Sequence, residues 1–172
     1  FTDTRPLDRK PENIHSILGH VRRIAEAGFG RNIVIREQYD PSLPAVSGNR
    51  DALVQIFLNL VKNAAEAIGV AGGKITLTTA YRHGMRVAVR GSNRRVSVPI
   101  EICVIDTGPG APSDIINHLF DPFVTSKPTR GGLGLALVAK LVSDHGGIVE
   151  YERRADPART VFRVLLPIAG KN

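Results

Sequence analysis

The sequence predicts an α/β fold, a two-layer sandwich in which a mixed β-sheet carries helices on one face. Segments with the apolar spacing of amphipathic helices alternate along the chain with segments patterned like strands. Two pairs of these strands follow each other without a helix between them, as in hairpins, so the sheet must be mixed rather than parallel. The 172 residues are 42% hydrophobic and 23% charged, which suits one domain with one core.

Two helices are expected in the first half of the chain, and glycines end each of them. Apolar residues recur at helical spacing over 12–27, and Gly28 ends that helix. Residues 33–39 are rich in β-branched side chains and predict a strand. A second helix is expected over about 50–68, after a loop that contains two prolines.

The second half is expected to consist mainly of strands. Residues 74–82 alternate polar and β-branched side chains, which predicts a half-exposed strand, and residues 85–90 are expected to be its hairpin partner. The apolar run at 99–105 predicts a central strand. The remaining expected elements are a helical turn around 113–119, a helix from about 131 to 145, and a hairpin of strands at 148–153 and 160–166.

Several features bear on the location of the chain. No stretch is long and apolar enough to cross a membrane, and no signal-peptide pattern is visible. The single cysteine, Cys103, cannot form an internal disulfide, which suits the cytoplasm. Because the chain begins with Phe1, we expect it to be a piece of a longer protein, with residues 1–10 as a linker and residues 11–170 as the folded domain.

The net charge of +7 comes partly from a basic segment at 82–95. A basic patch binds phosphates of any origin. Only Tyr81 among its neighbours is aromatic, so base stacking has little to act on. We interpret the segment first as a solvated hairpin, second as a partner surface and last as a nucleic-acid site, and we expect no nucleic-acid partner.

The helix at 50–68 carries a polar stripe beside its apolar face. Gln55, Asn59 and Asn63 are four residues apart, so they lie one above another. Carboxamide oxygens so placed suit a Mg²⁺ ion and its attached phosphates, because Mg²⁺ prefers oxygen ligands and keeps several waters. The alternative is an ordinary solvent-exposed face.

A glycine-rich turn follows the apolar strand at 99–105. It consists of Asp106, Thr107, Gly108, Pro109 and Gly110. A carboxylate at a strand end can accept a hydrogen bond from an exocyclic amine such as that of adenine, and glycines let the backbone approach a planar ligand. The alternative is a simple turn, for which the same residues are suited.

A second glycine-rich segment, at 130–137, opens the helix expected near residue 131. Free backbone N–H groups and the helix dipole favour phosphate at such a position, and Lys127 and Arg130 add positive charge. The segment is neither a P-loop nor a dinucleotide fingerprint. Before it, the aromatics of the Phe120–Phe123 segment resemble anchors of a movable lid. The alternative is ordinary loop packing.

The order and spacing of these four segments resemble the N, G1, F and G2 boxes of histidine kinase catalytic domains. The resemblance extends from about Glu12 to Ile168. The segments DPSLP at 40–44, NAAEAI at 63–68 and DPFVTSK at 121–127 are most similar to nitrogen-regulation sensor kinases of the NtrB type. The resemblance implies the Bergerat (GHKL) fold, with ATP and Mg²⁺ bound beneath a flexible lid at roughly 111–131.

The resemblance also implies residue roles. Asn63 is the expected Mg²⁺ ligand, Asp106 takes the adenine amine, and Asn59 and Lys127 are the expected catalytic residues. The full nucleotide-binding set comprises Asn59, Asn63, Asp106, Gly108, Gly110, Lys127, Arg130, Gly132, Leu133, Gly134, Leu135 and Thr160. Arg130 departs from the family pattern, which places glycine there, so it is expected to restrict the lid or to contact phosphate.

The residue at 59 favours a kinase over an ATP hydrolase. In the hydrolases of the superfamily a glutamate occupies this position and activates water. A carboxamide has no useful basicity, so Asn59 cannot act as that base. A nucleotide-controlled binding module, a GHKL ATPase and a serine kinase of the anti-sigma-factor type remain alternatives.

None of the five histidines lies in the sequence context that such kinases use for their phospho-acceptor. We therefore expect the chain to bind ATP without phosphorylating itself. The resemblance implies that the acceptor belongs to a dimerisation and histidine-phosphotransfer domain that residues 1–10 connect to this one. It also implies a response regulator and a nitrogen-status signalling protein as partners, a cytoplasmic location and no membrane contact.

Overall fold

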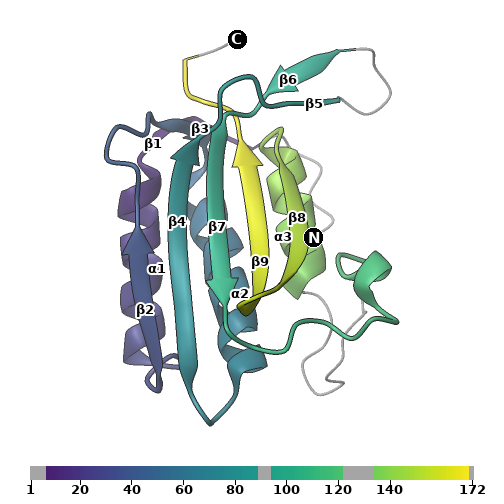
Figure 1. Ribbon diagram of the computed structural model, residues 1–172. Coiled ribbons are helices and arrows are strands. Elements are labelled where there is room, and N and C mark those ends of the chain that lie inside the picture. The colour runs from purple at the N-terminus through teal and green to yellow at the C-terminus, as the bar shows by residue number, and fades with distance from the viewer. Residues whose placement is uncertain (1–6, 89–93, 122–133, 171–172) are drawn as a thin grey trace.

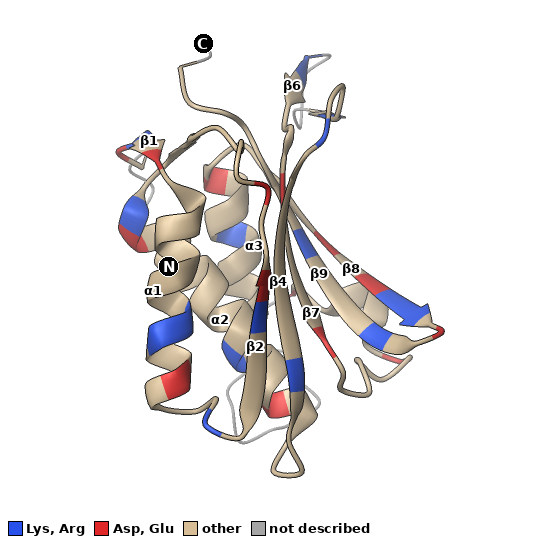
Figure 2. Cartoon of the chain, turned by 60° about the vertical axis from the view of Figure 1, so that its left-hand side comes forward, with Lys and Arg blue, Asp and Glu red and all other residues tan. Residues whose placement is uncertain are grey.

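Helices cover one face of a mixed β-sheet in this protein (Figure 1). The computed structural model describes residues 7–88, 94–121 and 134–170. Over these ranges three α-helices lie behind a five-stranded sheet. Figure 2, turned by 60°, shows the helices on one side of the strands and charged residues along β8 and β9. The two-layer sandwich expected from the sequence is therefore confirmed.

The strand order in the sheet is β2-β4-β7-β9-β8. The bounds are β2 Ile33–Gln38, β4 Gly73–Tyr81, β7 Ile100–Asp106, β9 Ala158–Leu166 and β8 Ile148–Ala155. Strands β2 and β4 are parallel, and the other three pairs are antiparallel. A parallel pair needs a crossover, and the second helix provides it between β2 and β4.

The first two helices begin at asparagine caps. In α1, Ile14–Ala27, the side chain of Asn13 accepts hydrogen bonds from the backbone N–H groups of His15 and Ser16. In α2, Arg50–Ile68, the side chain of Asn49 accepts one from Ala52. The third helix, α3, is described from Gly134 to Asp144. No helix in the three described ranges has both the length and the apolarity needed to cross a membrane.

The core lies between the helices and the sheet, with α2 at its centre. Leu53, Ile56, Phe57 and Leu60 are fully buried and pack against side chains of the central strands. Burying each such side chain contributes about 1.5–3 kcal/mol. This apolar face sets the rotation of α2 about its axis, and the stripe of Gln55, Asn59 and Asn63 is left at its less buried side.

One expected strand pairing is wrong. Residues 85–90 were expected to pair with 74–82, but β5, Arg86–Ala88, pairs with β6, Arg95–Ser97. The apolar strand β7 takes the edge of β4, in register from Ile75 opposite Asp106 to Tyr81 opposite Ile100. The seven-residue strand β7 is buried, whereas the three-residue strand β5 is largely exposed. Pairing β4 with β7 therefore buries more apolar side chains than pairing it with β5 would.

The chain between β4 and β7 forms a separate hairpin that projects beyond the end of the sheet (Figure 1). The backbone N–H of Arg82 donates to the carbonyl of Pro99 at 2.6 Å and closes the base of this hairpin. Two further short strands, β1 Lys10–Glu12 and β3 Val46–Gly48, pair with each other and were not expected. The turn expected at 113–119 is a 3₁₀ helix at Ile116–His118.

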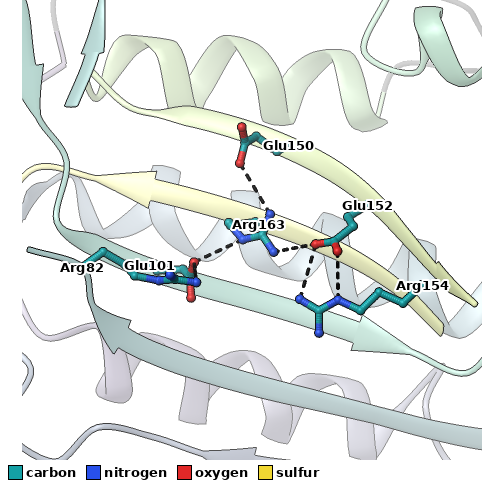
Figure 3. A network of polar contacts seen from close by, with 6 residues as sticks. All are labelled: Arg82, Glu101, Glu150, Glu152, Arg154 and Arg163. Carbon is teal, nitrogen blue, oxygen red and sulfur yellow. Dashed lines mark hydrogen bonds and ion pairs between the residues drawn. The ribbon is translucent and has the colours of Figure 1, made fainter. Parts of the chain in front are cut away.

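Charged side chains of β7, β8 and β9, together with Arg82 just after β4, form an outer-face network on the side of the sheet away from the helices (Figure 3). The outer-face network comprises Arg82, Glu101, Glu150, Glu152, Arg154 and Arg163. At its centre Arg163 Nη2 donates to Glu152 Oε1 at 2.7 Å. Arg163 Nε lies 3.2 Å from Glu101 Oε2, an ion pair without hydrogen-bond geometry. The network therefore buries charge on a face that carries none of the expected site residues.

Candidate functional site

The polar stripe of α2 runs toward the glycine turn that follows β7. Gln55 Nε2 donates to Asn59 Oδ1 at 3.1 Å, and both Asn59 and Asn63 are half-buried. Ala67 lies one helical turn beyond Asn63. A Cβ atom added to Gly108 would lie 3.0 Å from the backbone carbon of Ala67. The stripe and the turn therefore meet at the end of α2.

Asp106 ends the central strand β7 and is almost completely buried, with 1% of its surface exposed. The backbone N–H of Gly108 donates to Asp106 Oδ1 at 2.8 Å. Burial raises the pKa of Asp106 to about 6, although the Gly108 hydrogen bond and the charge of Arg153 act in the opposite direction. Near neutral pH the residue is therefore an ionised acceptor in a poorly solvated place, suited to a neutral donor such as an amine.

Gly108 and Gly110 allow the turn to pack closely. A Cβ on Gly108 would meet Asp106 Oδ1 at 2.9 Å. Gly110 has a φ angle of +81°, and a Cβ there would lie 2.9 Å from the Tyr151 hydroxyl. Gly108 thus lies beside the Asp106 carboxylate and Gly110 beside the β8–β9 hairpin, and a side chain fits at neither position.

Thr160 on β9 lies directly opposite Asp106 and is buried. Directly opposite residues of paired strands point to the same face of a sheet. The threonine hydroxyl and the aspartate carboxylate therefore share one end of the sheet, and their contact with a base stays a prediction.

The third expected group lies partly outside the described residues. Lys127, Arg130, Gly132 and Leu133 belong to the range 122–133, of which nothing is described. Gly134 and Leu135 begin α3, which packs against α2, and Leu135 is partly buried against the core. Among the described residues, and apart from its own helix, no atom would lie within 4 Å of a Cβ on Gly134. Their contact with phosphate remains a prediction.

Two residues of β8 near the site were missed from the sequence. Arg153 Nη1 donates to the Gly108 carbonyl at 2.7 Å and to Thr160 Oγ1 at 2.8 Å. The Tyr151 hydroxyl accepts a hydrogen bond from the backbone N–H of Ala111 at 3.0 Å. The expected hairpin at 148–166 could have identified Arg153, because pairing of its strands around the turn places Arg153 opposite Thr160.

Aromatic side chains pack beside the same row of residues. Phe162 makes edge-to-face contacts with Tyr151, at 5.4 Å between ring centroids, and with Phe120, at 6.2 Å. Phe120 is the first aromatic of the segment interpreted as a lid anchor, and its ring contacts β9 through Phe162. The second, Phe123, lies outside the described residues.

A magnesium ion at this site would need ligands other than a cluster of acidic residues. In the described part of the chain no group of three or more His, Cys, Asp or Glu side chains could hold a metal ion. The residue types at the stripe fit an ion that takes an amide oxygen and otherwise phosphate and water oxygens. Asn63 is the side chain that would hold it.

The sheet order, the helices on one face and the buried carboxylate beside a glycine turn are those of an ATP-binding α/β sandwich. The sequence profile described as "Histidine kinase-, DNA gyrase B-, and HSP90-like ATPase" matches residues 48–170. The chain belongs to this family. The fold and the type of catalytic domain expected from the four boxes are thereby confirmed.

Individual proteins add detail. The chain is 60% identical to the sensory histidine kinase/phosphatase NtrB of Rhizobium leguminosarum bv. phaseoli over 168 residues, which cover 97% of this chain and 43% of that protein. The chain thus spans less than half the length of this relative, and its resemblance to the NtrB type is confirmed.

Two solved structures share the fold. The catalytic domain of histidine kinase ThkA is 26% identical, with a TM-score of 0.75 over 94% of this chain and 96% of that one. Full-length ShkA in complex with AMPPNP is also 26% identical, with a TM-score of 0.76 over 97% of this chain and 32% of that one.

Proposed function

We propose that this chain binds ATP with Mg²⁺ and supplies the γ-phosphoryl group to a histidine on a dimerisation domain of the full-length protein, within a nitrogen-signalling two-component system. The observation that carries the proposal is the meeting of the α2 stripe with the Asp106 turn through Ala67 and Gly108. The Asp106 turn suits the base of a nucleotide, and the α2 stripe suits its phosphates. ShkA, which shares this fold, was solved with an ATP analogue.

The base end holds the adenine. The ionised Asp106 accepts a hydrogen bond from the exocyclic amine, and Gly108 and Gly110 keep the turn thin enough for the ring to approach. Thr160 offers its hydroxyl on the neighbouring strand. These contacts orient the nucleotide so that its phosphates extend along α2.

The phosphate end aligns the reacting group. Asn63 would hold Mg²⁺, which neutralises phosphate charge when bound. Asn59 Oδ1 is already engaged by Gln55, so its amide nitrogen is the group directed to a phosphate oxygen. Lys127, Arg130 and the backbone at Gly132, Leu133, Gly134 and Leu135 complete the proposed phosphate site. Phosphoryl transfer needs mainly such alignment and charge neutralisation. Water attack requires a base, and the carboxamide of Asn59 cannot act as one.

The partners follow from the same proposal. Residues 1–10 connect residues 11–170 to the dimerisation domain, and a response regulator and a nitrogen-status signalling protein complete the system. The curated relative is named a sensory histidine kinase/phosphatase, which supports this assignment. ATP as the phosphoryl donor places the reaction in the cytoplasm.

Calorimetric titration with ATP and GTP, with and without Mg²⁺, tests the proposal. We expect ATP to bind more tightly than GTP and Mg²⁺ to strengthen ATP binding. With γ-labelled ATP the chain alone stays unlabelled, whereas an added dimerisation domain carrying the acceptor histidine becomes labelled. Absence of nucleotide binding, or stable stoichiometric labelling of a histidine on the chain alone, would contradict the proposal.

A further inference from the structure

Arg153 lies at the end of a row of three in-register residues. Arg153 on β8 is opposite Thr160 on β9, and Thr160 is opposite Asp106 on β7. One nitrogen of the guanidinium, Nη1, donates to Thr160 Oγ1 at 2.8 Å and to the Gly108 carbonyl at 2.7 Å. The side chain thus joins β8 to both groups that flank the Asp106 carboxylate.

The direction of these hydrogen bonds follows from the chemistry of arginine. A guanidinium has only donors, so Thr160 Oγ1 must accept. The hydroxyl proton of Thr160 is then directed elsewhere and can be donated to a ligand. Gly108 is fixed on both sides, because its carbonyl accepts from Arg153 while its N–H donates to Asp106 Oδ1. The result is a carboxylate acceptor beside a hydroxyl donor.

Adenine and guanine present opposite patterns to such a pair. On adenine an amine donor lies next to a ring nitrogen acceptor, whereas on guanine a carbonyl acceptor lies next to an N–H donor. Resting on the proposed ATP site, we propose that Arg153 is a positioning residue that sets the preference for adenine over guanine by holding the Thr160 hydroxyl as a donor beside Asp106. A site with its polar groups fixed in this way rejects a base that leaves them unpaired.

The charge of Arg153 gives a second, independent effect. It lowers the pKa of Asp106, against the larger effect of burial, and the Gly108 N–H acts in the same direction as Arg153. Across the described residues no other charged side chain contributes to this pKa. Without the guanidinium, Asp106 should take up a proton at a higher pH and lose its role as an acceptor sooner.

The test uses the 172-residue chain titrated with ATP and with GTP at pH 7.5. In Arg153→Leu the ratio of the GTP and ATP dissociation constants should fall about threefold to tenfold, the value of a hydrogen bond. Thr160→Val should lower the ratio to the same extent, and the double variant should lower it no further, because both changes remove one interaction. Arg154→Leu, a change on the same strand within the outer-face network, should keep the wild-type ratio.

The pH dependence of ATP affinity separates charge from hydrogen-bond direction. Arg153→Leu should lose ATP affinity at a higher pH than wild type as the solution is acidified. Arg153→Lys keeps the charge but not the guanidinium geometry, so its pH profile should stay close to wild type while its ATP preference falls. If Arg153→Leu does not fold, Arg153→Lys alone tests whether Arg153 sets the preference for adenine.

The outcomes distinguish this role from the proposed function itself. A folded Arg153→Leu protein, or an Arg153→Lys protein, with the wild-type ratio of dissociation constants would overturn the role of Arg153 and leave the ATP site intact. A wild-type chain that binds neither nucleotide would overturn the proposed function, and the role of Arg153 with it.

Discussion

The backbone N–H of Asn49 donates to Nε2 of His145 at 3.1 Å, so one imidazole joins the start of α2 to the end of α3. Because Nε2 accepts, the proton of the ring lies on Nδ1, which donates to the Leu141 carbonyl at 2.7 Å. Arg9 Nη1 donates to the His145 carbonyl at 2.7 Å. The two helices that bear the proposed phosphate site are thus held together by a fully buried neutral histidine.

We expect His145 to make the fold sensitive to acid. Burial lowers its pKa from 6.5, so the unfolded chain binds the proton more readily than the folded chain does. The contribution of His145 to the free energy of unfolding is complete above about pH 6.5 and is lost as the pH falls further. Urea unfolding from pH 8 to pH 5 measures this dependence.

His145→Gln is the informative variant, because glutamine can accept from Asn49 and donate to Leu141 without titrating. Its free energy of unfolding should depend less on pH than that of wild type. His20→Gln, a change at an exposed position of α1, is the matched control and should leave the dependence unchanged. Equal pH profiles for wild type and His145→Gln would show that the imidazole does not act in this way.

Asp106→Asn should raise the stability of the nucleotide-free protein while it weakens ATP binding. The pKa of Asp106 is raised to about 6, so the ionised carboxylate costs folding free energy near neutral pH, and this cost decreases as the pH falls from 6 toward the ordinary pKa of 3.8. Without nucleotide the variant should therefore be more stable than wild type at pH 7.5, by up to about 3 kcal/mol. Chemical unfolding at pH 7.5 measures the difference, and a less stable variant would contradict it.

The same substitution should weaken ATP binding. An asparagine whose oxygen accepts from Gly108 turns its amine toward the adenine amine, so two donors oppose each other. The loss should be about 1.5–3 kcal/mol, the value of a hydrogen bond to a charged group, and selectivity for adenine should disappear. Wild-type affinity should fall below pH 6, whereas calorimetry on Asp106→Asn should show little change between pH 7.5 and pH 5. Wild-type affinity in the variant would remove Asp106 from the site.

Asn63→Ala tests the magnesium assignment. The variant should weaken ATP binding by about 1–3 kcal/mol in the presence of Mg²⁺, the scale of a lost charge-assisted contact. In EDTA the variant and wild type should differ much less, because the lost ligand then has no ion to hold. Lys62→Ala, an exposed change on the same turn of α2, is the control. Equal losses with and without Mg²⁺ would assign Asn63 to direct phosphate contact instead.

The sequence predicts features governed by local pattern and misses those governed by pairing. The extent of α2 and the position of Asp106 follow from apolar spacing and from a strand that runs into glycines. The partner of β4 does not follow from spacing, because it depends on whether β5 or β7 buries more apolar surface against it. Arg153 was missed for the same reason, since its role appears only once the register of β8 and β9 is known.

Arg163→Met tests the outer-face network. The Arg163 side chain is 16% exposed and contacts Glu101, which is 8% exposed, as well as Glu150 and Glu152. Removing the arginine leaves Glu101 buried, with the half-exposed Arg82 as its remaining ion-pair partner among the described residues, at 2.9 Å. We expect the free energy of unfolding to fall by about 1–3 kcal/mol, less than for a fully buried pair because the outer glutamates reach solvent.

The double variant Glu101→Met/Arg163→Met should recover part of that loss, because apolar side chains replace both buried charges. Two charges that lose a partner, Arg82 and Glu150, reach solvent, with 52% and 47% of their side chains exposed. Arg154→Met should cost less than about 1 kcal/mol, since its ion pair with Glu152 is more exposed. Urea unfolding of the three variants measures these differences. The ATP affinity of all three should equal that of wild type, because the network lies on the face of the sheet opposite the helices. A double variant less stable than Arg163→Met would show that Glu101 stabilises the fold through Arg82 rather than through Arg163.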